Sequence, residues 1–387
     1  MAYSAAALTA AEIAGFDNDK PMMVVQQAGS PSVAHWTYSG QSATGANKTD
    51  TDYPATRAYD DIGSLVTKPL QTDPVSATVS GITSPGVSPV VVTATGHPFL
   101  DGDQIFFYNV GGMTQLNYVA GDHNVYTVAN KSANDFQLSG VNSTGYDAWT
   151  SGGKAETVKN YNFDFGSTAE ISFDTLLLLN HNMSNSANVV LEIADNDTYS
   201  SNKIEIARHV STGLTDTGRW LITNLNSEGA GSTYSAGGTA QRYSSVRYAR
   251  LVVVDRYADV GEIFLGYRYQ LQRNPDLTWN NKNEVSNVTD FQSNTGLTKR
   301  YVLYRGQAVR SVSMGMGDSA EITVVDNWFN DINEGTRPFV WIDTPSSGAE
   351  ARLMLLDEAG LNFPLVGPFE RTLQFSTAEQ PPFLSRE

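Results

Sequence analysis

The stretch 160–182 (NYNFDFGSTAEISFDTLLLLNHN) places the strongest constraint on the fold of this chain. Ile171 and Phe173 alternate with polar residues, and the run 176–179 is apolar without interruption. Alternation of apolar and polar residues predicts a strand with one solvent-exposed face, whereas a short apolar run predicts a strand that is buried on both faces. Similar runs follow at 189–193, 251–254 and 260–265. We therefore predict a mainly β protein built around a β-sandwich.

Length, charge and the lack of cysteine exclude several classes of site and partner for this chain. The chain has 387 residues, no cysteine and a formal net charge of −16. This length allows two or three domains, each with its own core. The lack of cysteine excludes disulfides, cysteine–zinc sites and cysteine nucleophiles. Negative charge repels phosphate backbones, so we expect no specific nucleic-acid partner, and no run is long and apolar enough for membrane insertion.

The chain divides into an arm, a sandwich and a C-terminal domain. Residues 1–20 have neither the basic leader nor the apolar core of a signal peptide, so we expect an N-terminal arm with a short helix or a flexible stretch at 8–14. Residues 21–77 and 154–273 together carry the strands of the sandwich. A polar stretch then opens a C-terminal domain, residues 274–387.

Residues 78–153 interrupt the sandwich. Short strands in this segment are separated by Gly and Asn turns, the pattern of a small antiparallel β-barrel. Exposed loops accept whole-domain insertions when the two ends of the insert lie close together. We therefore expect Thr78 and Gly153 to lie side by side. We also expect the segment 164–166 to pair with residues before position 75 and not with the insert.

The C-terminal domain is predicted to be a second β-sandwich with one packed helix, residues 318–334. Asp318 can cap this helix, because Glu321 stands three residues later, which is the spacing of a capping box. Apolar residues recur at helical spacing, and Gly335 follows as a stop. Strands are expected on both sides of the helix, at 300–304, 308–312, 338–342, 351–356 and 369–375.

Several segments of the sandwich resemble discoidin-like jelly rolls, the C-type domains of coagulation factors. In the family's order, the matching segments are 58–60 (AYD), 164–166 (DFG), 177–182, 248–253 and 261–266. The family's usual cysteines are absent from this chain. The resemblance implies a jelly-roll β-sandwich, and domains of this family often bind carbohydrate or lipid through loops at one end.

The insert resembles a module found inside many bacteriophage virion proteins. The resemblance is carried by ATGHPFLDGDQIFF, VGGMTQLN, YTVAN and NDFQLSGVNSTGYDAWTSGG, and it covers about a fifth of the chain. That module is described as similar to the first catalytic cysteine half-domain of ubiquitin-activating enzymes. The description concerns a barrel shape. Because this chain has no cysteine, no thioester chemistry is implied.

The C-terminal domain resembles the ring-forming domain of phage tail-tube and distal-tail proteins. Its ending, RPFVWIDTP…FERTLQF…EQPPF, is similar to the C-termini of minor tail proteins of long-tailed phages. These resemblances imply a structural protein of the phage tail, at the distal tail or baseplate, made in the host cytoplasm and assembled into the virion. Copies of itself in a ring and other tail or baseplate proteins would be its partners. The residues expected at the ring interface are Trp328, Phe329, Phe339 and Trp341.

Two other functions remain open. The chain could be a carbohydrate-binding module that recognises a glycan of the host surface, or a head decoration or connector protein. Trp36, Tyr38, Trp149 and Tyr234 lie in loop-like stretches, where their rings could stack on a sugar. Subunit contact is the competing explanation, because aromatic residues are also enriched at protein interfaces.

We expect neither catalysis nor a cofactor. The five histidines form no metal-binding pair, and neither a G-x-S-x-G motif nor a P-loop occurs. Asp60 and Asp61 are adjacent, so on a strand they point to opposite faces and cannot flank one sugar bond. Asp195 and Asp197 could offer oxygens to a calcium ion, but the Gly and Glu positions of an EF-hand are missing. A polar hairpin turn is the alternative explanation for these two residues.

Overall fold

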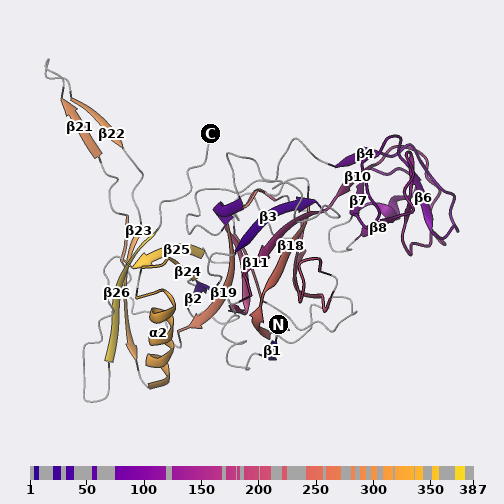
Figure 1. Cartoon of the computed structure of the whole chain (residues 1–387). Helices are drawn as coiled ribbons and strands as arrows, with labels where there is room; N and C mark the ends of the chain where they lie inside the picture. The colour runs from indigo at the N-terminus through magenta and orange to yellow at the C-terminus, as the bar shows by residue number, and fades with distance from the viewer. Residues whose placement is uncertain are drawn as a thin grey trace.

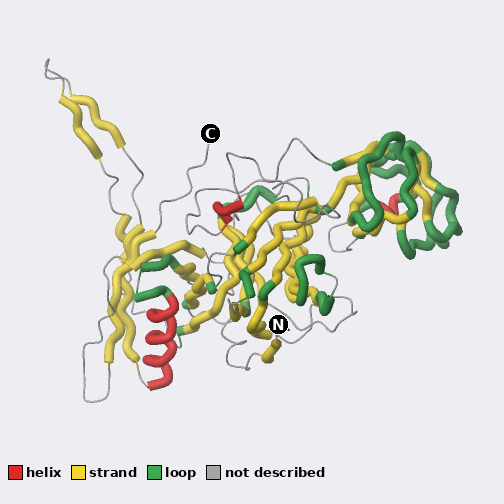
Figure 2. Tube along the Cα trace, viewed as in Figure 1, coloured by secondary structure: helices red, strands yellow, loops and turns green. Residues whose placement is uncertain are grey.

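The computed structural model shows a mainly β protein with several antiparallel sheets and one α-helix, α2 (Ser319–Asp331), in the part of the chain that it describes (Figures 1 and 2). The predicted mainly β class is thereby confirmed. The described residues are 4–7, 21–27, 32–38, 55–58, 75–118, 124–167, 171–179, 181–183, 187–199, 201–210, 220–224, 241–255, 259–271, 280–283, 288–292, 298–302, 308–316, 319–334, 336–342, 351–356 and 371–379.

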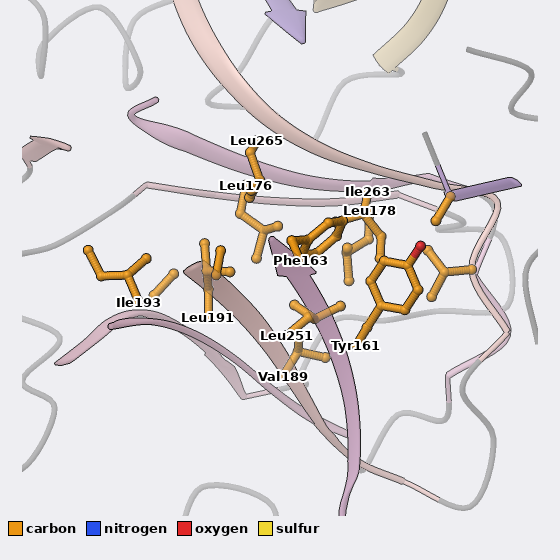
Figure 3. Packing of buried hydrophobic residues seen from close by; sticks show 14 of the residues in the cluster. Tyr161, Phe163, Leu176, Leu178, Val189, Leu191, Ile193, Leu251, Ile263 and Leu265 are labelled. Atoms are coloured by element: carbon orange, nitrogen blue, oxygen red, sulfur yellow. The ribbon is translucent and has the colours of Figure 1, made fainter. Parts of the chain in front are cut away.

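Two sheets face each other across the central core. The five-stranded sheet has the order β15 (Ile204–Val210), β14 (Asn188–Ala194), β18 (Tyr248–Val254), β11 (Lys159–Asp164) and β3 (Val33–Tyr38). The nine-stranded sheet has the order β16 (Trp220–Asn224), β13 (Thr175–Leu179), β19 (Glu262–Gln270), β2 (Met22–Gln26), β24 (Phe339–Ile342), β25 (Ala351–Leu356), β26 (Arg371–Glu379), β23 (Ala308–Met316) and β20 (Asn280–Asn283). Figure 3 shows side chains from both sheets, such as Tyr161 and Leu178, meeting between them.

Strand β13 is covered on both faces, as its uninterrupted apolar run predicts. Leu176 and Leu178 point into the central core, while Leu177 and Leu179 belong to a second apolar cluster on the opposite face. All four side chains are buried. At roughly 1.5–3 kcal/mol for each fully buried large aliphatic side chain, these four leucines together contribute on the order of 6–12 kcal/mol of burial free energy.

Strand β11 is where the chain returns to the five-stranded sheet after the insert. It pairs with β18 on one side and with β3 on the other, with Asp164 opposite Val33. The prediction that this segment pairs with residues before position 75 is therefore confirmed. Phe163 and Tyr161 of β11 fill the core side of this sheet.

The insert and the two strands that flank it, β4 and β10, form one seven-stranded antiparallel sheet with its own core. Its order is β4 (Ser76–Thr78), β10 (Lys154–Thr157), β7 (Gln104–Tyr108), β8 (Val125–Ala129), β9 (Asp135–Leu138), β6 (Val90–Thr93) and β5 (Gly81–Ile82). Thr78 lies opposite Lys154, and the Val79 amide donates to the Gly153 carbonyl at 2.9 Å. The expected proximity of the two ends is therefore confirmed. No ladder closes this sheet into a barrel in the described residues, so a closed barrel is not part of the observed fold.

The C-terminal part shares a sheet with the sandwich. Strand β2 pairs with β19 on one side and with β24 on the other, so the hydrogen-bonded ladder crosses the predicted boundary at residue 274. Helix α2 lies within the predicted span 318–334 and packs on the C-terminal half of the sheet. Its buried face consists of Val325 and Trp328, with Ile332 just beyond its last turn. The proposed cap, Asp318, lies outside the described residues.

Two smaller sheets complete the described chain. Strand β1 (Ser4–Ala7) pairs with β17 (Gln241–Val246), which also pairs with β12 (Ile171–Phe173). Part of the predicted N-terminal arm is therefore a strand, while residues 8–14 lie outside the described residues. Strands β21 (Val288–Gln292) and β22 (Thr298–Val302) form a separate hairpin. Figure 1 shows this hairpin and the insert at opposite ends of the molecule.

Candidate functional site

The aromatic residues expected to stack on sugars do not form a common surface. Trp36 and Tyr38 lie in β3, not in a loop, and their exposed fractions are 0% and 3%. Trp36 packs on Tyr161 in the central core, and Tyr38 packs into the core of the insert. This prediction was wrong for both residues, because buried rings cannot receive a ligand. Trp149 is half-buried and donates through Nε1 to the Gly152 carbonyl, and Tyr234 lies outside the described residues.

The aromatic residues expected at a ring interface belong instead to the core beneath α2. Trp328, Phe339 and Trp341 are buried within the chain itself, and the Trp328 and Phe339 rings meet edge to face at 4.9 Å. Phe329 is partly buried against the same cluster. The prediction was wrong for the three buried residues, since a second copy cannot reach them without unfolding this part of the sheet.

Asp195 and Asp197 lie in the connection between the paired strands β14 and β15, residues 195–203. The Asp195 amide donates to the Ser201 carbonyl, and the Asp195 carboxylate accepts from the Asn202 amide. This geometry supports the polar hairpin turn. Among the residues that the structure describes, no group of three or more His, Asp or Glu side chains is placed to hold a metal ion.

The outer face of the five-stranded sheet, the face away from the central core, is organised in three rows. The covered row contains Val190 and Val252, which pack beneath Phe106 of the insert together with Tyr108, Tyr118 and Val125. The middle row runs across four strands through Glu192, Arg250, Asn162 and His35. The open row runs beside it through Ala194, Tyr248, Asp164 and Val33. The insert therefore covers one end of this face. At the other end Ala194 is still buried, Tyr248 and Asp164 are partly exposed, and Val33 is exposed.

The middle row is held by a network of charged groups. Arg250 donates from Nε to Glu192 Oε2 at 2.8 Å, and Lys203 Nζ lies 3.3 Å from Glu192 Oε1. Burial alone raises the pKa of Glu192, but the charges of Arg250 and Lys203 hold it below its usual value. The Arg250 guanidinium also lies 4.4 Å from the ring centroid of Tyr199, whose hydroxyl donates to the Ala249 carbonyl. Glu192 is thus fixed as an anion.

At the His35 end of the middle row, the imidazole is buried and both ring nitrogens lack a hydrogen-bond partner. Burial lowers the pKa of His35, so the ring is neutral near pH 7. The nitrogens themselves are out of reach of solvent, so His35 is not a ligand-contacting group in this arrangement. Its neighbour Asn162 donates to the Thr37 hydroxyl at 2.6 Å.

The open row carries a bidentate ion pair beside an aromatic ring. Arg247 donates from Nε to Asp164 Oδ1 at 2.9 Å and from Nη2 to Asp164 Oδ2 at 3.2 Å. The same guanidinium lies 4.6 Å from the ring centroid of Tyr248. Burial raises the pKa of Asp164, but the hydrogen bonds and the charge of Arg247 bring it below its usual value. Asp197 of the β14–β15 turn acts electrostatically on both Arg247 and Tyr248.

A buried lysine ties the insert to the sandwich. Lys159 Nζ donates to the Asp255 carbonyl at 2.6 Å and lies 3.5 Å from Glu156 Oε1. Glu156 belongs to the insert strand β10, and Asp255 follows the sandwich strand β18. Burial lowers the pKa of Lys159, while the nearby carboxylates act in the opposite direction. Together with the apolar covered row, this cluster fixes the insert against the sheet.

Sequence reasoning missed the open row as a site. Asp164 and Tyr248 stand in the D-F-G and Y-A-R-L segments, which in the sequence indicate only the fold. Nothing local marks them as neighbours, because Asp164 and Arg247 meet across 83 positions of sequence.

Comparison with known proteins provides no family for this chain. No protein-family model and no curated protein matches its sequence. In the described part of the chain, no helix has the length and apolar character needed to cross a membrane.

Proposed function

We propose that this chain is a structural protein of a bacteriophage tail, placed at the distal tail or baseplate, which assembles into a homo-oligomeric ring. The main observation in support of this assembly is the β21–β22 hairpin. Its ten residues pair only with each other among the described strands. Figure 1 shows the hairpin standing clear of the nine-stranded sheet.

An isolated two-stranded hairpin is marginally stable in water and normally needs a third strand or a packing surface. Each of the two strands has one edge whose backbone groups pair with no described strand. Such edges are ready templates for pairing with another chain. A neighbouring copy in a ring would supply the missing strand or surface. The support is this geometry together with the sequence resemblances to tail proteins.

The finer architecture belongs to the same proposal. The central sandwich corresponds to a discoidin-like jelly roll, the insert to the barrel-like module of virion proteins, and the C-terminal part to a tail-tube-like domain with one helix. The order of segments, the adjacent ends of the insert and the packing of α2 on the sheet support these assignments. The insert at the opposite end from the hairpin would then project outward as a platform.

The assembly is tested by the mass of the purified protein in solution. Replacing residues 288–302 with a short Gly-Ser turn should convert the oligomer to a monomer in light scattering. The control variant removes the insert between Val79 and Gly153, whose backbone groups are 2.9 Å apart, and should keep the oligomeric state. A wild-type monomer, or an oligomer that survives loss of the hairpin, would refute the assembly. Antibody label on the capsid of phage particles would refute the tail assignment.

A further inference from the structure

Strand β3 contributes side chains to two hydrophobic cores. Trp36 packs on Tyr161 in the central core, whereas Tyr38 belongs to the core of the insert. The backbone of Tyr38 lies opposite Lys159, the first residue of β11 after the insert. Among the described strands, β3 pairs with β11 alone and so forms an edge of the five-stranded sheet. Detachment of this one edge strand would therefore remove a contact between the insert and the sandwich.

His35, the residue before Trp36, faces the opposite side of β3. Its side chain is buried, and neither ring nitrogen has a hydrogen-bond partner. A neutral imidazole has one N–H donor, whereas the protonated ring has two donors and a positive charge. Protonation in place would therefore add a second unpaired donor and an unpaired charge to a buried site, and burial of either is costly.

No described acidic side chain is placed to pair with a protonated His35. The residue opposite it on β11 is Asn162, which is neutral. Asp164, two residues further along β11, is bound by Arg247 at both of its carboxylate oxygens. The remaining described acids on the outer face lie beyond β18, on β14, on β15 or in their connection: Glu192, Asp195, Asp197 and Glu205. A charge on His35 would therefore not be compensated.

The other elements that pack near β3 add no acceptor for this charge. The short helix η1 (Ala55–Ala58) contacts β3, and its one charged residue is the base Arg57. In the insert, the Glu156 carboxylate pairs with Lys159. Burial raises the pKa of both tyrosines of the outer face, so they are neutral in acid: Tyr199 and Tyr248. Burial is also the one cause that lowers the pKa of His35.

We propose that His35 is an acid-sensitive switch: its protonation detaches β3 from β11 and loosens the contact between the insert and the sandwich. Once β3 is detached, the imidazole reaches water and can hold its charge. Burial lowers the pKa of His35 from 6.5, so the detached strand binds the proton more tightly than the paired strand does. The stability that the neutral buried imidazole contributes is present above pH 6.5 and is lost as the pH falls below that value. The switch is independent of the assembly and of the tail assignment proposed above.

Acid should leave the interior of the insert closed. Burial raises the pKa of Asp103 to about 6, so the folded insert binds this proton more tightly than the unfolded chain does. The stabilisation due to that proton is complete in acid and is lost as the pH rises through about 6. Asp103 and His35 therefore respond to pH in opposite directions. This difference separates the switch from general unfolding in acid.

The test is amide hydrogen exchange of the full-length chain at about pH 7.5 and about pH 5, expressed as protection factors so that the direct effect of pH on exchange cancels. Protection of residues 33–38 should fall about tenfold in acid, because each pH unit below 6.5 changes the detachment equilibrium about tenfold while the buried imidazole stays neutral. Protection of β8 and β13 should not fall. His35→Phe cannot be protonated and should remove the acid response. His97→Phe changes another buried histidine and should keep it.

A second measurement follows the insert itself. Because the chain has no cysteine, two spin labels can be attached at Thr127→Cys in β8 and Thr198→Cys in the β14–β15 connection, both at exposed positions. The distribution of distances between the labels should broaden in acid. With His35→Phe added, the distribution should stay narrow at both pH values.

Four outcomes would overturn the proposal: unchanged protection of residues 33–38 in acid, an equal loss of protection in β13, an unchanged distance distribution, or an acid response that survives in His35→Phe. Melting curves at neutral pH show whether each variant is folded. If His35→Phe does not fold, His35→Gln replaces it, since glutamine is neutral at both pH values.

Discussion

Replacing Asp103 with asparagine should stabilise the insert near neutral pH and leave it unchanged in acid. Asp103 is 3% exposed, its Oδ2 accepts from the Leu100 amide at 2.8 Å, and its Oδ1 has no partner. Burial raises the pKa of this carboxyl from 3.8 to about 6, while the Leu100 amide and the charge of Lys131 act in the opposite direction. The folded insert therefore binds a proton at Asp103 more tightly than the unfolded chain does.

The sign of the pH dependence follows directly from this raised pKa. The stabilisation due to the bound proton is complete below about pH 4 and is lost as the pH rises through about 6. At about 1.4 kcal/mol per pKa unit, a rise of about two units means that the ionised carboxylate costs the insert up to about 3 kcal/mol at pH 7. Asparagine resembles the protonated acid and keeps the acceptor for the Leu100 amide, so it removes that cost.

The measurement is amide hydrogen exchange of β7 and β8 in the full-length protein, with wild type and variant compared at the same pH. Protection in the variant should exceed wild type by about tenfold or more at pH 7, which corresponds to about 1.4 kcal/mol. The two should converge near pH 4. The control is Asp101→Asn, an exposed residue of the same turn. Equal protection of wild type and Asp103→Asn at both pH values would refute the reasoning.

Three further substitutions test the packing. Asp174→Asn should lower the free energy of unfolding by about 3–5 kcal/mol in urea denaturation, because it removes the buried negative charge that forms ion pairs with Arg242 and Arg268. An unchanged midpoint would contradict this. Gly112→Ala should destabilise the insert alone, since a Cβ would stand 2.1 Å from the Ala148 carbonyl and φ is +80°; exchange should rise in 104–108 and not in β13. Trp328→Ala should lower the free energy of unfolding by about 3–5 kcal/mol and keep the oligomer, because the side chain is internal. A variant that is folded but dissociated would show that Trp328 is an interface residue after all.

Much of the strand content could be predicted because the number of buried faces of a strand determines which of its successive residues are apolar. The apolar run of β13 has two covered faces, and the alternation at Ile171 and Phe173 has one, so each pattern follows from its own surroundings. The adjacent ends of the insert were predictable for a different reason. A chain that leaves a sheet and returns to it must come back near its point of departure.

The site was harder to predict because it depends on non-local pairing. Strand β3 stands in a polar stretch that reads as a loop, and it becomes a strand because β11 pairs with it, with Trp36 opposite Tyr161. The same pairing buries the Trp36 ring, which a loop would have left exposed to a ligand. Likewise, Trp328 and Phe339 are apolar whether they meet each other or a second copy, so composition alone cannot separate a core from an interface.

The pairing of β2 on both sides has a mechanical consequence. The ladder runs without a break from β13 and β19 through β2 to β24, β25, β26 and β23. A force applied at the β20 edge is therefore transmitted across these strands to the sandwich, shared at each step among several backbone hydrogen bonds. The two narrowest steps are β2–β24 and β25–β26, since three residue pairs join the strands at each. Under tension the ladder should part first at one of these two steps, while the core around β13 stays folded.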